Sequence, residues 1–419
     1  MDYEAFLTQY NLKRFVDAQR LDYVTALDEI TVGEKYSHWM WYIFPQLKGL
    51  GHSQTAKFYG IVDREEAIMY LYHPLLGPRL FEATQAMLAI TDKSAVEILG
   101  SIDALKFRSC MTLFDSVCPN AVFAKALQRF FQGEPDPLTL KMLGNEKERD
   151  QLLPGSIIGS VIGDVVGSVY EFHNRKSISF PLFTERSKFT DDTVMTVAVA
   201  DWLTNDTVLP EAMVKWGHAY PNRGYGDMFR RWLFLETDRA PYNSFGNGAG
   251  MRVSPCGYYG QSLEEVLSLA KQSAEVTHNH PDGIKGAQAI AAAIFLARQR
   301  KSKEEIRSYI EETFGYDLHR SCDEIRPGYQ FDVTCPGSCP EAIIAFLESD
   351  SYLSTIRLAV SLGGDSDTIA CMAGGIAAAY YGIPAWLVKL VVTEYLPRDM
   401  RALIQRFDDR CAERGCLTT

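Results

Sequence analysis

Two acid-rich segments that lie far apart in the chain constrain its fold and chemistry more than any other feature. The segment FTDDT (189–193) leads into an apolar run, and GGDSDT (363–368) leads into a second one. Each places Asp and Thr where a loop turns into a helix, a position these residues favour because their oxygens accept hydrogen bonds from free N–H groups. Helix capping explains either segment alone. Two matched segments indicate that both contribute to one site.

The oxygen atoms of these segments are ligands for a hard cation. Carboxylates and hydroxyls, with no Cys or His among them, suit Mg²⁺, with Mn²⁺ or Ca²⁺ as alternatives. Four carboxylates in one site cannot all stay ionised without a cation that offsets their repulsion, which predicts two metal ions. The expected metal ligands are Thr190, Asp191, Asp192, Asp365, Asp367 and Thr368.

Composition excludes several classes of protein. A hydrophobic content of 47% over 419 residues is typical of a folded chain of two domains, and the formal charge of −11 argues against a surface that coats nucleic acid. The first residues, MDYEAFLTQY, have neither the basic nor the apolar region of a signal peptide. The most apolar stretch (368–382) is interrupted by glycines, which indicates a buried helix rather than a membrane span. We therefore expect a cytoplasmic protein without a membrane partner.

Apolar residues recur at three- and four-residue spacing through most of the chain, and no convincing series of strands is present. The pattern predicts an all-α protein of two domains: a helical domain over 1–143, a larger one over 153–419, and a linker over 144–152 that contains the charged run GNEKERDQ.

Three further motifs lie in the second domain. Glycines recur every four residues from Gly155 to Gly167, so they share one helical face and let another helix approach closely. The loop SFGNGAGMRVSP (244–255) offers backbone N–H groups that can bind an anion, although this signal is weak by itself. His278 and His280 lack a third zinc ligand, and neither is a convincing general base.

These segments, in this order, resemble the ADP-ribosylglycohydrolase family from about residue 153 to 400: GSIIGSVIGDVVGSVYEF (155–172), FTDDT, SFGNGAGMRVSP, VTHNHPDGIKGAQA (276–289) and GGDSDT. The resemblance implies an orthogonal bundle of helices and a Mg²⁺-dependent hydrolase that cleaves the N- or O-glycosidic bond between ADP-ribose and a modified target. Two Mg²⁺ ions (or Mn²⁺) would bind the ribose and activate a water molecule. It also implies substrate contacts by Ser244, Phe245, Gly246, Asn247, Gly248 and His278.

The resemblance assigns catalytic roles to Glu171, Asp191 and Asp365, with Glu171 on a mobile segment above the metals. The general base stays open between Glu171 and Asp365. ADP-ribosylarginine in a protein is the favoured substrate, while serine, a nucleobase in modified nucleic acid, or a free ADP-ribose derivative stay open. An alternative of another class is an immunity or antitoxin protein that sequesters an ADP-ribosyltransferase. The complete set of metal ligands favours the enzyme.

The N-terminal segments SHWMWYIFPQLKGLG (37–51), YGI (59–61) and HPLLGPRL (73–80) resemble a small family of unknown function, loosely called calpastatin-like, over about residues 4–140. The resemblance implies no established chemistry. The aromatic residues between 39 and 44 are expected to form core. The alternative is an aromatic pocket that stacks a base, with His38, Gln46, Lys48 and Arg79 at its rim.

Overall fold

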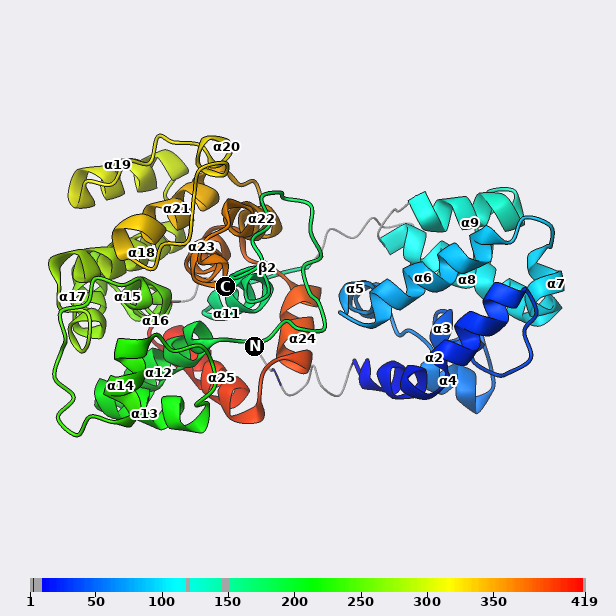
Figure 1. Cartoon of the computed structure of the whole chain (residues 1–419), viewed down its shortest axis with the longest axis horizontal. Helices are drawn as coiled ribbons and strands as arrows, with labels where there is room; N and C mark the ends of the chain where they lie inside the picture. Colours follow the sequence, from blue (N-terminus) through cyan, green and yellow to red (C-terminus); the bar gives the residue numbers. More distant parts are fainter. Residues whose placement is uncertain (1–2, 4–9, 118–120, 145–150, 417–419) are drawn as a thin grey trace. The chain divides into compact units, whose positions relative to one another are not determined.

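The computed structural model describes residue 3 and residues 10–117, 121–144 and 151–416 (Figure 1). The chain forms two compact units, one built mainly from Ala5–Gln151 and the other mainly from Leu152–Leu182 and Arg186–Thr419. Both are helical, which confirms the expected all-α, two-domain architecture. The predicted linker includes residues 145–150, which lie outside the described residues, so the boundaries stay a prediction. None of the described helices has both the length and the apolar character needed to cross a membrane.

The N-terminal unit packs short helices around an aromatic core. Trp39 and Phe44 are fully buried, and the ring of Phe44 meets Phe107 edge-on at 4.8 Å between centroids. Trp41 is only half-buried, beneath the ammonium group of Lys106. Most of the aromatic patch is therefore core, as expected. The helices of this unit are α2 (Lys13–Val32), α3 (Met40–Ile43), α4 (Gln54–Tyr59), α5 (Arg64–Tyr72), α6 (Leu76–Ala89), α7 (Ala95–Leu99), α8 (Ser101–Val117), α9 (Ala121–Phe131) and α10 (Pro137–Leu143).

The larger unit is a bundle of helices with one antiparallel pair of two-residue strands, β1 (Leu152–Leu153) and β2 (Ile383–Pro384). Its helices are α11 (Ile158–Gly167), α12 (Asp191–Asn205), α13 (Leu209–Ala219), α14 (Asp227–Phe234), α15 (Gly248–Met251), α16 (Ser254–Tyr259), α17 (Leu263–Glu275), α18 (Pro281–Arg298), α19 (Lys303–Phe314), α20 (Cys322–Ile325), α21 (Cys335–Glu348), α22 (Tyr352–Leu362), α23 (Ser366–Tyr381), α24 (Ala385–Glu394) and α25 (Arg398–Glu413).

The glycines of α11 allow direct contact with α23, and the two helices lie side by side (Figure 1). A Cβ atom at Gly163 would lie 2.0 Å from the carbonyl oxygen of Ala370, and one at Gly167 would lie 2.4 Å from Cα of Asp367. No side chain fits at either distance, because packed interiors leave no such space. The close approach brings the residues that follow α11 next to the first turn of α23.

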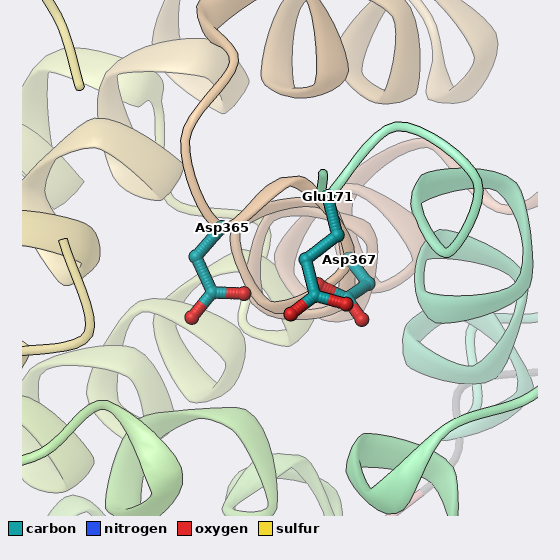
Figure 2. A group of neighbouring side chains, drawn as sticks. All are labelled: Glu171, Asp365 and Asp367. Atoms are coloured by element: carbon teal, nitrogen blue, oxygen red, sulfur yellow. The ribbon is translucent and has the colours of Figure 1, made fainter. Parts of the chain in front are cut away.

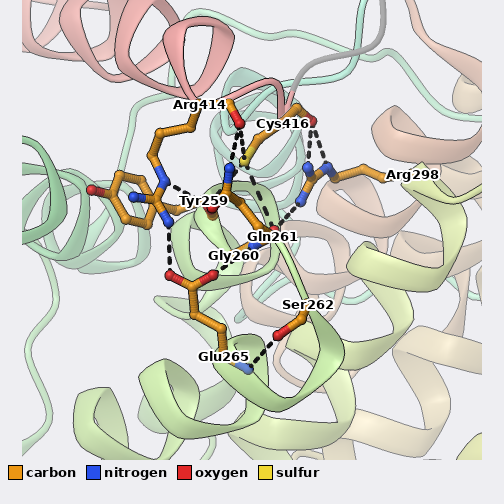
Figure 3. Close-up of polar contacts among 8 residues, drawn as sticks. All are labelled: Tyr259, Gly260, Gln261, Ser262, Glu265, Arg298, Arg414 and Cys416. Atoms are coloured by element: carbon orange, nitrogen blue, oxygen red, sulfur yellow. Dashed lines mark hydrogen bonds and ion pairs between the residues drawn. The ribbon is translucent and has the colours of Figure 1, made fainter.

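The last described residues hold the far end of α18 in place. The buried guanidinium group of Arg298, in the last turn of α18, donates to the carbonyl oxygens of Cys416 and Gly260 (Figure 3). Arg414 pairs with Glu265 of α17 at 2.7 Å. These charge-assisted bonds tie the last described residues to α17 and α18. The other end of α18 carries the His280 cap and follows His278.

Candidate functional site

The start of α12 is fixed by a buried carboxylate from α11. Thr190 caps the helix, and its hydroxyl accepts a hydrogen bond from the backbone N–H of Asp192. Asp164 is fully buried and accepts from the backbone N–H of Thr190 at 2.9 Å and from its hydroxyl at 2.7 Å. Its Oδ2 also accepts from the backbone N–H and hydroxyl of Thr193. Asp164 therefore orients this turn, and with it the acids at residues 191 and 192.

Three carboxylates from two distant segments converge beside this turn. Glu171 comes from the segment after α11, whereas Asp365 and Asp367 come from the start of α23. Figure 2 shows the three side chains pointing toward one another. One oxygen from each lies within 4.8 Å of the others, which is close enough for all three to contact a single cation. Asp365 and Asp367 are buried, and Glu171 is half-buried.

Asp192, from the first acid-rich segment, contacts Thr368 of the second segment. Its Oδ2 accepts from the hydroxyl of Thr368 at 3.3 Å, and it lies 3.3 Å from the hydroxyl oxygen of Thr190, whose hydrogen is directed to Asp164. Its Oδ1 is buried without a hydrogen-bond partner among the described residues. A buried carboxylate oxygen normally has a partner, so an orphaned one fits a cation ligand.

All the predicted metal ligands line one cavity of about 520 Å³. Glu171 and five of the six predicted substrate-contacting residues, namely Ser244, Gly246, Asn247, Gly248 and His278, line the same cavity. The exception is Phe245, which does not line it. Its ring is 46% exposed and lies 5.2 Å from the ring of His280.

The acids of this cavity repel one another strongly. Burial, and then the charge of Asp164, raises the pKa of Asp191 and of Asp192 well above the usual range. Burial and the charge of Asp365 also raise the pKa of Asp367 well above the usual range. The same two causes raise the pKa of Glu171 to about 7. A divalent cation would reverse these shifts, because it favours the ionised form of every carboxylate around it. The donor set and its charge therefore fit a hard metal ion.

The glycine-rich loop contacts the acids directly. The side-chain amide of Asn247 donates to Oδ2 of Asp365 at 2.7 Å and to the hydroxyl of Ser338 at 3.2 Å. Two backbone N–H groups of the loop are already engaged, because Gly246 donates to the Ser244 hydroxyl and Asn247 donates to the Val333 carbonyl. An anion at this loop therefore needs donors beyond these two.

His280 has a local structural role. It is the N-cap of α18, and its Nδ1 accepts from the backbone N–H of Asp282 at 3.1 Å.

Several lining residues were not predicted. Phe172 and Phe331 stack at 5.9 Å between centroids, and both rings are largely exposed. The position of Phe172 directly after Glu171 was the one available signal. Other lining residues come from segments without a recognisable motif; they are Arg223, Gly224, Gly226, Asp227, Met228, Phe229, Tyr242 and Val333.

Comparisons with known proteins match the two parts of the chain to two different families. The profile of a family described as "Protein of unknown function (DUF1810)" matches residues 9–143, and the profile described as ADP-ribosylglycohydrolase matches residues 145–415. Both resemblances inferred from the sequence are confirmed.

Curated relatives match the C-terminal part. ADP-ribosylhydrolase ARH3 of Mus musculus is 31% identical over 265 residues, which cover 48% of this chain and 71% of the relative. ADP-ribosylarginine hydrolase Tri1 of Pseudomonas putida is 26% identical over 260 residues, which cover 54% of this chain and 68% of the relative.

Two solved structures are also similar. A conserved hypothetical protein of Mycobacterium tuberculosis is 44% identical to the matched region. The match covers 32% of this chain and 96% of the solved chain, with a TM-score of 0.32. A structure titled "ADP-ribosylglycohydrolase-related protein complex" is 24% identical and covers 61% of this chain and 96% of its own, with a TM-score of 0.48.

The family profile spans most of the chain, and the acidic cavity lies within it. The chain belongs to the ADP-ribosylglycohydrolase family, whose members hydrolyse glycosidic bonds of ADP-ribose.

Proposed function

We propose that this chain is a Mg²⁺-dependent hydrolase that cleaves the N- or O-glycosidic bond between ADP-ribose and a modified protein, and so reverses ADP-ribosylation. The observation that carries the proposal is the convergence of Glu171, Asp365 and Asp367 in the cavity that also contains the glycine-rich loop. Arginine is the favoured acceptor. The similarity to a relative named as an ADP-ribosylarginine hydrolase supports this choice.

Two Mg²⁺ ions, replaceable by Mn²⁺, are proposed to be held by Thr190, Asp191, Asp192, Asp365, Asp367 and Thr368. When bound, these ions supply positive charge that favours ionised carboxylates and a deprotonated water molecule. Asp164 and Asn247 orient the ligands from outside, the first through Thr190 and the second through Asp365. Such supporting hydrogen bonds fix ligand geometry and tune the affinity for metal.

Glu171 is the better candidate for the general base. Without metal, burial and the charge of Asp365 raise its pKa to about 7, and a bound cation would lower this pKa again, so the choice rests on the position of Glu171 in the cavity. It is also half-buried, so its carboxylate can reach both the cavity and solvent. Asp365 is less suitable, since one of its oxygens already accepts from Asn247. In this mechanism Glu171 takes the proton of the water that attacks the anomeric carbon. The bond between that carbon and the acceptor atom breaks, and the acceptor leaves with the electron pair and receives the proton back from Glu171.

The direct test is the release of ADP-ribose from arginine-, serine- and guanine-linked substrates, with and without Mg²⁺. We expect Mg²⁺-dependent release from the arginine linkage by the full chain. Asp365→Ala should abolish it, whereas the matched control Asp238→Ala, at an exposed position of the same unit, should not.

Each other outcome changes the proposal in a defined way. Release from serine or guanine alone would replace arginine as the acceptor. Release that is insensitive to Mg²⁺ would refute the metal-dependent mechanism. No release from any linkage, by a folded chain that binds Mg²⁺, would favour the alternative of a protein that sequesters an ADP-ribosyltransferase. In that case the N-terminal unit, which we propose selects the target or a partner, would be tested for transferase binding.

A further inference from the structure

The segment that carries Glu171 has no regular structure of its own. Residues 168–190, all of which the structure describes, form neither helix nor strand. Tyr170, directly before Glu171, is anchored: it is buried, and its phenol donates to the carbonyl oxygen of Pro181 at 2.7 Å. After Glu171 the chain is exposed as far as residue 179. Exposed loops of this kind open easily, so the carboxylate needs a second anchor to keep its place beside Asp365.

The side chain of Asn174 provides that anchor. Its Nδ2 lies 2.8 Å from the carbonyl oxygen of Glu171, 2.9 Å from that of Tyr170 and 3.2 Å from that of Gly364. Nδ2 carries two hydrogens, so the three oxygens share them. The backbone N–H of Gly364 donates to Oδ1 of Asn174 at 2.7 Å. These bonds, which we call the Asn174 tether, join the backbone of Glu171 to the residue before Asp365.

The surroundings of the Asn174 tether define its geometry. A backbone N–H donates only to an acceptor, so the Gly364 contact identifies Oδ1 and directs Nδ2 to the carbonyl oxygens. Gly363 leaves the space for this contact: its φ is +76°, and a Cβ atom there would lie 2.8 Å from Oδ1 of Asn174. Lys176 holds the next part of the segment, because its ammonium group donates to the carbonyl oxygens of Leu362 and Tyr329. Loss of the tether therefore frees Glu171 without releasing the whole segment.

We propose that Asn174 is a positioning residue that holds Glu171 at the place from which it accepts the proton of the attacking water. Proton transfer needs the carboxylate within about 3 Å of that water, and a displacement of about 1 Å can slow a reaction up to about a hundredfold. Asn174 is exposed, so its replacement removes these bonds without leaving a cavity in the core. The role of Glu171 rests on the proposed function, whereas the tether does not.

Hydrogen exchange measures the tether without any activity. In the metal-free full chain, mass spectrometry follows peptides that cover residues 168–176 and 360–366. Asn174→Ala should speed exchange in both peptides, because one side chain bonds both. Asn174→Asp keeps an acceptor for the Gly364 N–H but has no N–H donors, so it should speed exchange in the first peptide alone. The control His173→Ala, at the neighbouring exposed position, should change neither.

A double-mutant cycle tests whether Asn174 acts through Glu171. For Mg²⁺-dependent release of ADP-ribose from the arginine linkage, Asn174→Ala should lower kcat roughly tenfold at unchanged KM, which is part of the roughly 10²–10⁴-fold that a general base contributes. In single turnovers of Glu171→Gln, the added Asn174→Ala should cause no further loss. A purely structural role would slow both backgrounds alike. His173→Ala should keep the wild-type kcat.

The outcomes separate this inference from the proposed function. Unchanged exchange in both peptides of Asn174→Ala, or equal slowing in the wild-type and Glu171→Gln backgrounds, would overturn the inference. A rise in KM at constant kcat would also overturn it, because Asn174 would then act on binding. Faster exchange in the Asn174→Ala variant of a chain that releases ADP-ribose from no linkage would refute the proposed function and the positioning role together, while the tether itself would stand.

Discussion

Replacing Glu171 with Gln should stabilise the metal-free protein, although it damages the proposed site. Burial, and then repulsion by Asp365, raises the pKa of Glu171 from 4.5 to about 7. Below about pH 4.5 the carboxyl is protonated in the folded and unfolded chains alike, so it costs nothing. As the pH rises from 4.5, the pKa of Glu171 in the unfolded chain, toward 7, Glu171 ionises freely only in the unfolded chain, so the free energy of unfolding falls. Above pH 7 Glu171 is ionised in both states, and the loss of stability stays constant.

The magnitude follows from the size of that shift. A rise from 4.5 to about 7 corresponds to at most about 3.4 kcal/mol of lost stability. Glu171 is half-exposed, and solvent screening of such a group reduces the figure to roughly 1–2 kcal/mol. Glu171→Gln removes this cost. We therefore expect the free energy of unfolding of the metal-free chain to rise by roughly 1–2 kcal/mol at about pH 8, and by less than half as much at about pH 5.

Urea unfolding in the presence of a chelator measures this difference. The relevant transition is the one that Mg²⁺ shifts in the wild-type chain, because the two units can unfold separately. Glu264→Gln, at an exposed position in the first turn of α17, is the control and should not stabilise the chain. Stabilisation by Glu171→Gln that is equal at both pH values, or none at about pH 8, would refute the account of a repulsive acid cluster.

Two further predictions concern packing and ligand support. Gly163→Ala should destabilise the chain by roughly 1–3 kcal/mol, because the new Cβ atom would overlap a backbone carbonyl of α23. Gly328→Ala is the control and should not destabilise the chain, because nothing lies within 4 Å of the added Cβ atom. Urea unfolding compares the two variants, and equal effects would contradict the close contact. Asn247→Ala should weaken Mn²⁺ affinity roughly tenfold or more, since Asp365 loses a hydrogen-bond donor. Calorimetry checks this against Asn205→Ala, which should bind Mn²⁺ like the wild type.

The residue types and spacing predicted much of the fold. The apolar periodicity indicated helices, and the regular glycines of α11 indicated a close helix contact, which the distances at Gly163 and Gly167 confirm. These features are local, so they can be read from short segments. The acidic segments could be recognised as helix starts for the same reason, and Thr190 is indeed the cap of α12.

Contacts between distant segments could not be predicted in this way. Residue types and spacing do not show that Glu171 meets Asp365 and Asp367, because this contact depends on how α11 crosses α23; only the family resemblance placed Glu171 above the metals. The hydrogen bonds from Asn247 to Asp365 and from Arg252 to Thr277 join loops whose relative positions only the packed helices determine. The local sequence also does not reveal that Phe245, unlike its neighbours in the loop, does not line the cavity.

The number of metal ions tests the central claim most directly. Titration of the full chain with Mn²⁺, followed by electron paramagnetic resonance, counts the bound ions, and competition with Mg²⁺ shows whether the two metals share a site. We expect two Mn²⁺ ions per chain, displaced by Mg²⁺, and loss of both in Asp367→Asn, whose carboxylate lies within the acid cluster. No bound ion in the wild-type chain, or binding that survives Asp367→Asn unchanged, would contradict the account.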